Sequence, residues 1–481
     1  MFKHLTPVLL AALVAGCAVG PNYHRPELDH PDAWRNSDTT FYADTSTVRA
    51  ETAWWYLFGD SVLNDLISIA LQDNTDVRIA AARVEELLGR YGVARSDFFP
   101  KIGAAGSASR GQFLSGEVTR GGGSARNRFQ VNLAADWEID LWGKIRRATE
   151  AARADLLATE EARRGVVLTT ASLVASSYID LLALDRQLEI ARQTVATRRE
   201  ALDLFEFRRE EGDLSDLVFS QAESEYWLAV SQIPLIEENI EFLENAINYL
   251  LGRNPGPVRR GATLDGLTLP EVPVDMPSAL LERRPDVRFA EEQLRAANAR
   301  IGVAKSLYFP SISLSGLLGY ASDDLSELVN SDTRTWSVGG DVLQPIFRWG
   351  EIKGQVKASE GMQKQALYGY VQAVRNAFRE TENALVYRSR TGEQLDAEGK
   401  RVAALSTYAR LAKMRYEEGV TSYLEVLDAE RALFSAELAY AQTKSELHKS
   451  VLAIYEALAG SWLDAAADTS FRIEEGVEPR Q

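Results

Sequence analysis

Residues 129–143 read FQVNLAADWEIDLWG, and apolar and polar side chains alternate through most of this stretch. One set of alternate positions is apolar, namely Phe129, Val131, Leu133, Ala135, Trp137 and Ile139. Most positions between them are polar, namely Gln130, Asn132, Asp136, Glu138 and Asp140. A period of two predicts a β-strand with one apolar and one polar face. The Trp142-Gly143 pair then marks the change to a helical pattern.

The chain contains this arrangement twice. Residues 76–102 and 286–312 match at an offset of 210, with 12 of 27 positions identical. The match continues at an offset of 207, from 141–145 to 348–352 and from 208–212 to 415–419. A repeat of this kind predicts one structural unit used twice rather than two unrelated domains.

Each copy is expected to contain a helical segment (Val62–Ser96 in the first), a pair of strands, a long helix and a return helix. The strands are expected at about 101–140 and 310–347. The long helices are expected at 144–211 and 351–418, which lack proline and would each run roughly 100 Å at a rise of 1.5 Å per residue. Gly212 and Gly419 are expected to end them in left-handed caps. Pro234 is expected to break or kink the first return helix.

The N-terminus carries a targeting signal. Lys3 and His4 precede a short apolar run that ends at Val14-Ala15-Gly16-Cys17, the order of parts in a secretory signal peptide. Cys17 is the only cysteine, and the tripeptide before it resembles a bacterial lipobox. Cleavage would make Cys17 the acylated first residue; the alternative is a plain signal peptide with an incidental cysteine.

The expected division of the chain follows from these features. It comprises a signal peptide at 1–16, a lipid-anchored N-terminal tether at 17–60, a first repeat at 61–252, a linker at 253–275, a second repeat at 276–460 and a polar C-terminal tail at 461–481.

Composition excludes several classes of protein. The 481 residues have a mean hydropathy of -0.20, which argues against a helical membrane bundle. Beyond the N-terminal signal, no run of about 18 apolar residues is expected to span a bilayer as a helix. The net charge of -16 argues against nucleic acid as a partner. The histidines that remain after signal removal, His24, His30 and His448, lack metal-ligand spacing, and no phosphate-loop or nucleophile-elbow motif occurs, so we expect neither an enzyme nor a cofactor.

Four strands cannot close a barrel alone, and lipid does not tolerate open sheet edges. If the strands span an outer membrane, several chains must share one barrel, and three chains would give twelve strands and leave room for a passage. The pattern alone leaves two alternatives open, a soluble sandwich with one wet face for the strands and a filled bundle for the helices.

Further motifs carry a resemblance to a known family. These are residues 20–26 (GPNYHRP), Trp54-Trp55 with Phe58 and Asp60, 140–144 (DLWGK), 284–288 (RPDVR) and 415–419 (RYEEG). With them the chain resembles the TolC-like outer-membrane factor family, and most closely its OprM-type lipoprotein branch. The resemblance covers about Cys17 to Gly460. It implies an α+β membrane protein, a homotrimer whose twelve-stranded β-barrel continues into a long periplasmic α-helical barrel.

The resemblance also implies a function and partners. It implies the exit duct of an efflux system in the outer membrane, working with a periplasmic adaptor and an inner-membrane pump, usually of the resistance-nodulation-division type. The other reading of the sequence is an envelope structural protein or adhesin without a conducting lumen. The cargo cannot be predicted, since selection among substrates in such systems lies largely in the pump.

The same resemblance points to functional residues near the second tip turn. Glu425 and Asp428 match positions that narrow the inner opening, and Tyr416 matches a position that helps to hold it shut. Arg431 follows Asp428 by three residues, so a helix would let them pair; a plain solvated helical face is the alternative. Two family features are absent, because Thr421 and Val218 occupy positions that often hold an arginine and an acidic residue. Trp142-Gly143 and Trp349-Gly350 are expected at the junctions between barrel and helices.

Overall fold

The computed structural model describes residues 18–29, 31, 34–35, 42–43, 53–111, 125–273 and 283–458. The predictions for the signal peptide, for Cys17 and for the tail at 461–481 therefore fall outside the described residues. The chain forms two compact units, and each takes segments from both repeats. Unit 1 comprises residues 1–27, 83–159 and 289–371, and unit 2 comprises 28–82, 160–288 and 372–481.

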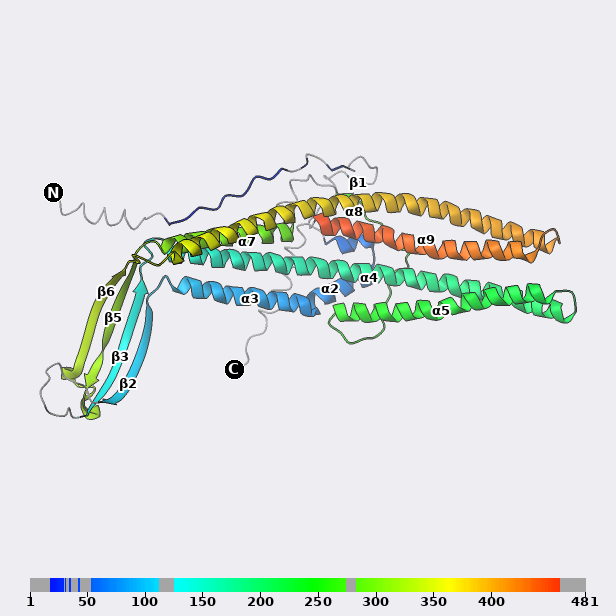
Figure 1. Ribbon diagram of the computed structural model, residues 1–481. Helices are drawn as coiled ribbons and strands as arrows, with labels where there is room; N and C mark the ends of the chain where they lie inside the picture. Colours follow the sequence, from blue (N-terminus) through cyan, green and yellow to red (C-terminus); the bar gives the residue numbers. More distant parts are fainter. Residues whose placement is uncertain are drawn as a thin grey trace. The chain divides into compact units, whose positions relative to one another are not determined.

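Unit 1 contains an antiparallel sheet of four strands in the order β2-β3-β5-β6 (Figure 1). The strands are β2 (Lys101–Gly111), β3 (Arg126–Glu138), β5 (Ser311–Ser322) and β6 (Arg334–Leu343). Leu133 of β3 lies opposite Ala104 of β2 and Leu318 of β5, which in turn lies opposite Trp336 of β6. Residues in register share a face, so the apolar alternate positions of all four strands form one face. The opposite face carries Ser107, Asn132, Ser315 and Ser337 among others.

Residues 18–25, at the start of the predicted tether, are bound to other segments of unit 1. The backbone amide of Val19 donates to the Trp142 carbonyl at 3.0 Å. Gly20, with φ of +105°, lies so close to Gly302 that a Cβ would come within 2.5 Å of its Cα. Arg25 and Tyr23 both bind the Glu291 carboxylate, at 2.6 and 3.2 Å. The polar side chains of this segment thus have partners on helix α7 (Pro285–Ser306), and these contacts hold it in place.

The long helices are α4 (Lys144–Glu210) and α8 (Glu351–Glu417), which match the predicted spans to within one residue. One 18-residue window of α4 is apolar enough to cross a membrane, contrary to our expectation, but 67% of it is buried inside the protein. This window is buried because its side chains pack in the core of unit 2, among them Val167, Ala171, Val174 and Tyr178. The hydropathy of this window therefore reflects packing.

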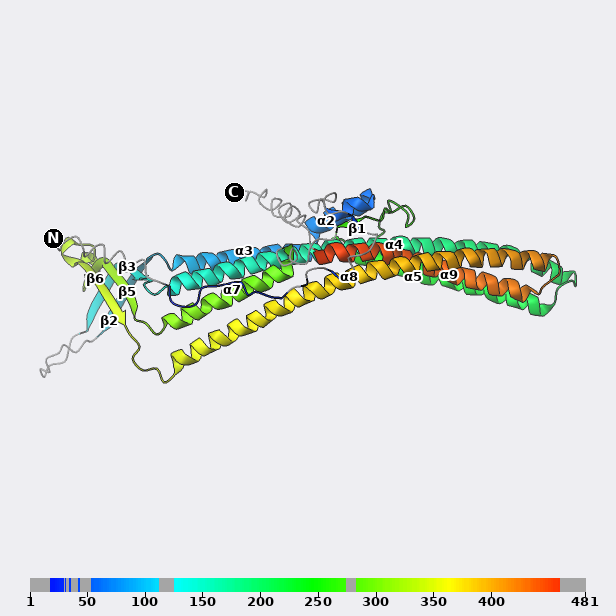
Figure 2. The same cartoon turned by 90° about the horizontal axis from the view of Figure 1, so that it is seen from above.

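In unit 2 the return helices α5 (Asp216–Leu250) and α9 (Tyr423–Leu458) run back beside α4 and α8 (Figure 1 and Figure 2). The expected break at Pro234 is wrong, because α5 continues through it. Pro234 lies on the exposed side of α5, where the Val230 carbonyl that loses its donor can face water. Ile236, Ile240 and Ile247 are buried in the core, and their packing holds the turns of the helix that follow Pro234.

The helical segment expected over Val62–Ser96 forms two helices, α2 (Ser61–Asp73) and α3 (Thr75–Ser96). Asn74 adopts an extended backbone between them, and its side-chain oxygen accepts from the amides of Asp76 and Val77. This is an N-cap for α3, a local bond that competes with a continuous helix.

The Trp54-Trp55 motif lies in a short 3-10 helix, η1 (Trp54–Phe58), in the core of unit 2. Asp60 follows it, caps α2, and accepts from the Tyr178 hydroxyl and the Ala262 amide, both at 2.8 Å. Nearby, the backbone of β1 (Tyr42–Ala43) pairs in parallel with β4 (Val272–Pro273). The motif is therefore structural, because every one of these contacts lies within the fold of unit 2.

Candidate functional site

Both tip turns have the predicted glycine caps. Gly212 has φ of +81° and Gly419 has φ of +75°, a left-handed conformation that glycine adopts without strain. The amide of Asp213 donates to the Arg208 carbonyl at 2.8 Å, and that of Val420 donates to the Arg415 carbonyl at 2.9 Å. These bonds satisfy carbonyls at the ends of α4 and α8 and turn the chain into the return helices.

An aromatic cluster joins the two helical hairpins at the tip. Phe205 of α4 contacts Tyr423 of α9 edge-on, with ring centroids 4.5 Å apart. Tyr416 of α8 completes the group, 5.2 Å from Tyr423 and 6.2 Å from Phe205. Tyr416 thus packs between the two hairpins of one chain and stabilises the contact between them.

Glu425 is held by its own hairpin. One carboxylate oxygen accepts from the Arg415 guanidinium at 3.0 Å, and the other accepts from the Thr421 hydroxyl. The glutamate side chain is 28% exposed. Thr421 therefore contributes to the tip as a hydrogen-bond donor.

Three of the four predicted aperture residues, Glu425, Asp428 and Arg431, line one open depression of about 420 Å³, whereas Tyr416 lies in the aromatic cluster. The lining of the depression consists of Tyr408, Thr421, Ser422, Leu424, Glu425, Leu427, Asp428 and Arg431. Asp428 is exposed at its rim. Arg431 makes its hydrogen bond to Glu225 of α5, and this bond raises the pKa of Arg431; the charge of Asp428 raises it further. The expected interaction between Asp428 and Arg431 is therefore a charge interaction without a hydrogen bond in the described contacts, and Asp428 is exposed.

Glu225 is the main feature that sequence reasoning missed. Its side chain is 7% exposed and lies between Arg431 and the equally buried Arg198 of α4, whose Nη1 is 3.3 Å from the carboxylate. The same Nη1 donates to the Glu225 carbonyl at 2.6 Å. Burial lowers the pKa of Arg198 and the Glu225 charge raises it again; burial also raises the pKa of nearby Glu430. One carboxylate thus connects three helices, α4, α5 and α9.

The first junction pair is tightly docked within unit 1. Trp142 donates from its indole Nε1 to the Pro310 carbonyl at 2.8 Å and stacks on Phe309 at 4.8 Å. Gly143 has φ of +78° and faces Ala18 so closely that a Cβ would come within 2.7 Å. Asp140 caps α4 through the amides of Ile145 and Arg146, each at 2.9 Å.

The second junction pair differs. Trp349 is 89% exposed, and its own backbone has φ of 47°. Among the described residues, and apart from its own chain neighbours and helix backbone, nothing lies within 4 Å of the place that a Cβ on Gly350 would take. The two copies of the Trp-Gly motif therefore differ in packing, since the first is packed within unit 1 and the second is exposed.

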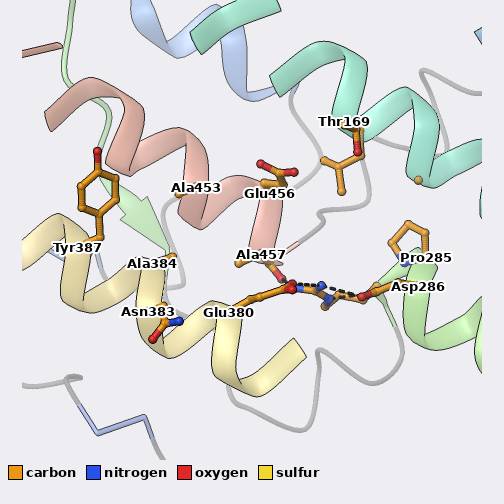
Figure 3. A pocket seen from close by; sticks show the side chains of 13 residues that line it. Thr169, Pro285, Asp286, Glu380, Asn383, Ala384, Tyr387, Ala453, Glu456 and Ala457 are labelled. Carbon is orange, nitrogen blue, oxygen red and sulfur yellow. Dashed lines mark hydrogen bonds and ion pairs between the residues drawn. The ribbon is translucent and has the colours of Figure 1, made fainter. Parts of the chain in front are cut away.

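Arg284, from the 284–288 motif, lines a cavity of about 590 Å³ in unit 2 (Figure 3). Its guanidinium binds Asp286 at 2.7 and 2.9 Å, Glu380 of α8 at 2.6 Å and the Ala457 carbonyl of α9 at 3.1 Å. Asp286 and Glu380, both labelled in Figure 3, belong to different helices, α7 and α8. We interpret this motif as an ionic joint between helices. In the part of the chain that the structure describes, no cluster of His, Cys, Asp and Glu could hold a metal.

Comparisons with known proteins agree with this geometry. The family model described as outer membrane efflux protein matches residues 66–253 and 276–460. The cation efflux system protein CusC of Escherichia coli O6:H1 is 33% identical over 95% of this chain and 98% of its own length. The toluene efflux pump outer membrane protein TtgI of Pseudomonas putida is 33% identical over 96% of this chain and 98% of its own length. The solved outer-membrane channel OprN is 30% identical with a TM-score of 0.86, covering 93% of this chain and 100% of that one.

Proposed function

The chain belongs to the outer membrane efflux protein family, and we propose that it forms the exit duct of a tripartite efflux system. The observation that carries this proposal is the four-stranded sheet with one apolar face and one polar face. The apolar face suits lipid and the polar face suits a water-filled lumen. A single chain supplies too few strands to close a barrel.

Three copies would complete the barrel with twelve strands. The polar face would then line the lumen with small and hydroxyl-bearing side chains, such as Ser107, Asn132 and Ser337. A lumen of this kind offers few tight contacts, as suits a duct that releases its cargo. The names of CusC and TtgI refer to cations and to toluene, so relatives of similar identity serve different cargo, and we assign a duct without a cargo.

The partners that we propose are a periplasmic adaptor and an inner-membrane pump of the resistance-nodulation-division type. They would meet the chain at the tip turns of Gly212 and Gly419. We also propose that Glu425 and Asp428 narrow the inner opening, since both line the same depression beside the second turn. Asp428 is exposed there, and three copies around one axis would form a ring of carboxylates that favours cations.

We propose in addition that Cys17 is acylated and anchors the chain in the outer membrane. The adjoining residues 18–25 are bound to unit 1, so an acyl chain on Cys17 would be held beside that unit. Growth with labelled palmitate should label the wild type and leave Cys17→Ser unlabelled. Absence of label from the wild type would contradict the anchor and leave the duct proposal standing.

Conductance in a planar lipid bilayer tests the duct itself. Purified protein should insert and give discrete conductance steps. An envelope structural protein or adhesin would bind the membrane or the cell wall without such steps. Leu133→Arg, on the apolar face of β3, is the matched control for contaminating porins, because it should weaken insertion and make the steps rarer, whereas steps from a contaminant would be unaffected.

A further inference from the structure

The cavity that Arg284 lines has the size of a small-molecule binding site. Its volume of about 590 Å³ lies within the roughly 300–1,000 Å³ of such sites in proteins. Helices α4, α8 and α9 each turn one face toward it, with residues spaced three or four apart: Gly165 and Thr169, Glu380 and Ala384, and Ala453 and Glu456. The cavity is therefore formed by the packing of three long helices within unit 2.

The apolar part of the lining consists of small or buried side chains. Leu168, Ala384 and Ala457 are all buried. Gly165 adds space, because among the described residues, and apart from its chain neighbours and helix backbone, no atom lies within 4 Å of the place that a Cβ would take. These positions leave room for the apolar body of a ligand.

The polar part of the lining consists of side chains that are open to a ligand. Thr169, Asn383 and Glu456 line the cavity and are labelled in Figure 3. In the part of the chain that the structure describes, none of these three side chains makes a hydrogen bond or a salt bridge, and all three are exposed. A few polar groups on an otherwise apolar lining are typical of ligand sites, where they fix the orientation of the ligand.

The contacts of Arg284 decide the sign of the charge that the cavity can accept. Its guanidinium is 8% exposed, and all three of its nitrogens donate hydrogen bonds, to Asp286, to Glu380 and to the Ala457 carbonyl. An anionic ligand would have to displace one of these bonds. Glu456 has no such partner, so the available charge is negative and favours a cation. The apolar lining suits an organic cation better than a metal ion.

We propose that this cavity binds an organic cation, an ammonium group joined to a small apolar body. The ammonium donates to the Glu456 carboxylate, and the apolar body lies against Leu168 and Ala453. Charge-assisted hydrogen bonds are roughly twice as strong as neutral ones, so the carboxylate determines which ligands bind. Binding does not depend on the proposed duct, because it requires neither a membrane potential nor an open tip.

Saturation-transfer NMR with three probes tests the class of ligand. The full chain in lipid nanodiscs is titrated with 2-phenylethylammonium, with neutral 2-phenylethanol of nearly the same size, and with tetramethylammonium, which lacks the apolar body. Empty nanodiscs report the partition of each probe into lipid. We expect 2-phenylethylammonium to bind with a Kd of about 1 mM, as suits its size, and the other two to bind at least about tenfold more weakly.

Two variants test the charge and the space separately. Glu456→Gln keeps the size of the side chain and should weaken 2-phenylethylammonium about tenfold, while 2-phenylethanol is unaffected. Glu393→Gln is the matched control, since Glu393 is an exposed residue of α8 outside the cavity that pairs with Arg390 at 2.7 Å. Gly165→Leu should fill the cavity and abolish binding of both phenyl compounds. Leucine favours helix more than glycine does, so circular dichroism should show α4 intact.

Every result bears on the site directly. Preference for the amine that is lost in Glu456→Gln, kept in Glu393→Gln and accompanied by loss of all binding in Gly165→Leu supports the proposal. Equal binding of the amine and the alcohol, unchanged affinity for the amine in either cavity variant, or no signal above that of empty nanodiscs overturns it. None of these results alters the duct proposal, which conductance of the wild type tests separately.

Discussion

Glu225→Ala is expected to loosen the helical tip by about 3 kcal/mol, since breaking a buried ion pair costs about 3–5 kcal/mol. The lower end applies because Arg198, 5% exposed, keeps its bond to the backbone carbonyl of residue 225. Arg431→Ala removes the outer partner, which is 56% exposed, and leaves Glu225 paired with Arg198. Its cost is expected to be about 0.5–1 kcal/mol, as for exposed ion pairs.

Amide hydrogen exchange of the purified protein measures this difference locally, because tip helices open without global unfolding. Peptides from the ends of α4 and α9 should exchange roughly a hundredfold faster in Glu225→Ala and less than about tenfold faster in Arg431→Ala. Glu238→Ala, an exposed position on the same helix, is the matched control and should change stability by less than about 0.5 kcal/mol. Equal exchange in Glu225→Ala and Glu238→Ala would refute the reasoning.

Three further outcomes are expected. Leu133→Arg should destabilise the membrane-inserted sheet by about 2–4 kcal/mol in urea titrations, while Asn132→Arg on the polar face should be mild; equal damage would indicate a soluble sheet. Glu425→Ala combined with Asp428→Ala should raise single-channel conductance and reduce cation preference, and unchanged recordings would place the constriction elsewhere. Burial, with Lys444 and Arg388 nearby, lowers the pKa of His448 from 6.5 to about 4. The folded state then binds fewer protons, so stability should fall by about 3 kcal/mol as pH drops from 6.5 to 4, and His448→Gln should flatten a melting curve against pH over that range.

The sheet could be predicted closely because its signal is local. Alternation through Phe129–Ile139 defines which side chains share a face, and the observed register keeps that set on one face. The long helices could also be predicted from the sequence, because α4 and α8 contain no proline and a glycine follows the end of each. Of the break or kink predicted at Pro234, the break is wrong, because the tertiary packing of Ile236 and Ile240 overrides the local rule for proline.

The sequence motifs predicted where the tip turns lie, but they did not predict which side chains bind each other there. Arg431 lies three residues after Asp428, and that spacing favours pairing on an isolated helix. Its partner Glu225 is 206 positions away in the sequence and lies on another hairpin. A local spacing rule cannot rank these two carboxylates, because the stronger bond depends on how α5 packs against α9.

The internal duplication nevertheless contains a signal for this network. At the offset of 207, Arg198 and Glu225 of the first copy correspond to Leu405 and Ala432 of the second, and Arg431 corresponds to Ser224. A buried charge costs free energy unless it is paired. Arg198 and Glu225, which only the first copy has, therefore pair with each other within one hairpin, and Glu225 also binds the exposed Arg431 of the other hairpin. At Trp142 and Trp349 the residues agree and the surroundings differ. Buried charges that one copy has and the other lacks thus indicate residues that pair with each other, even where no local spacing relates them.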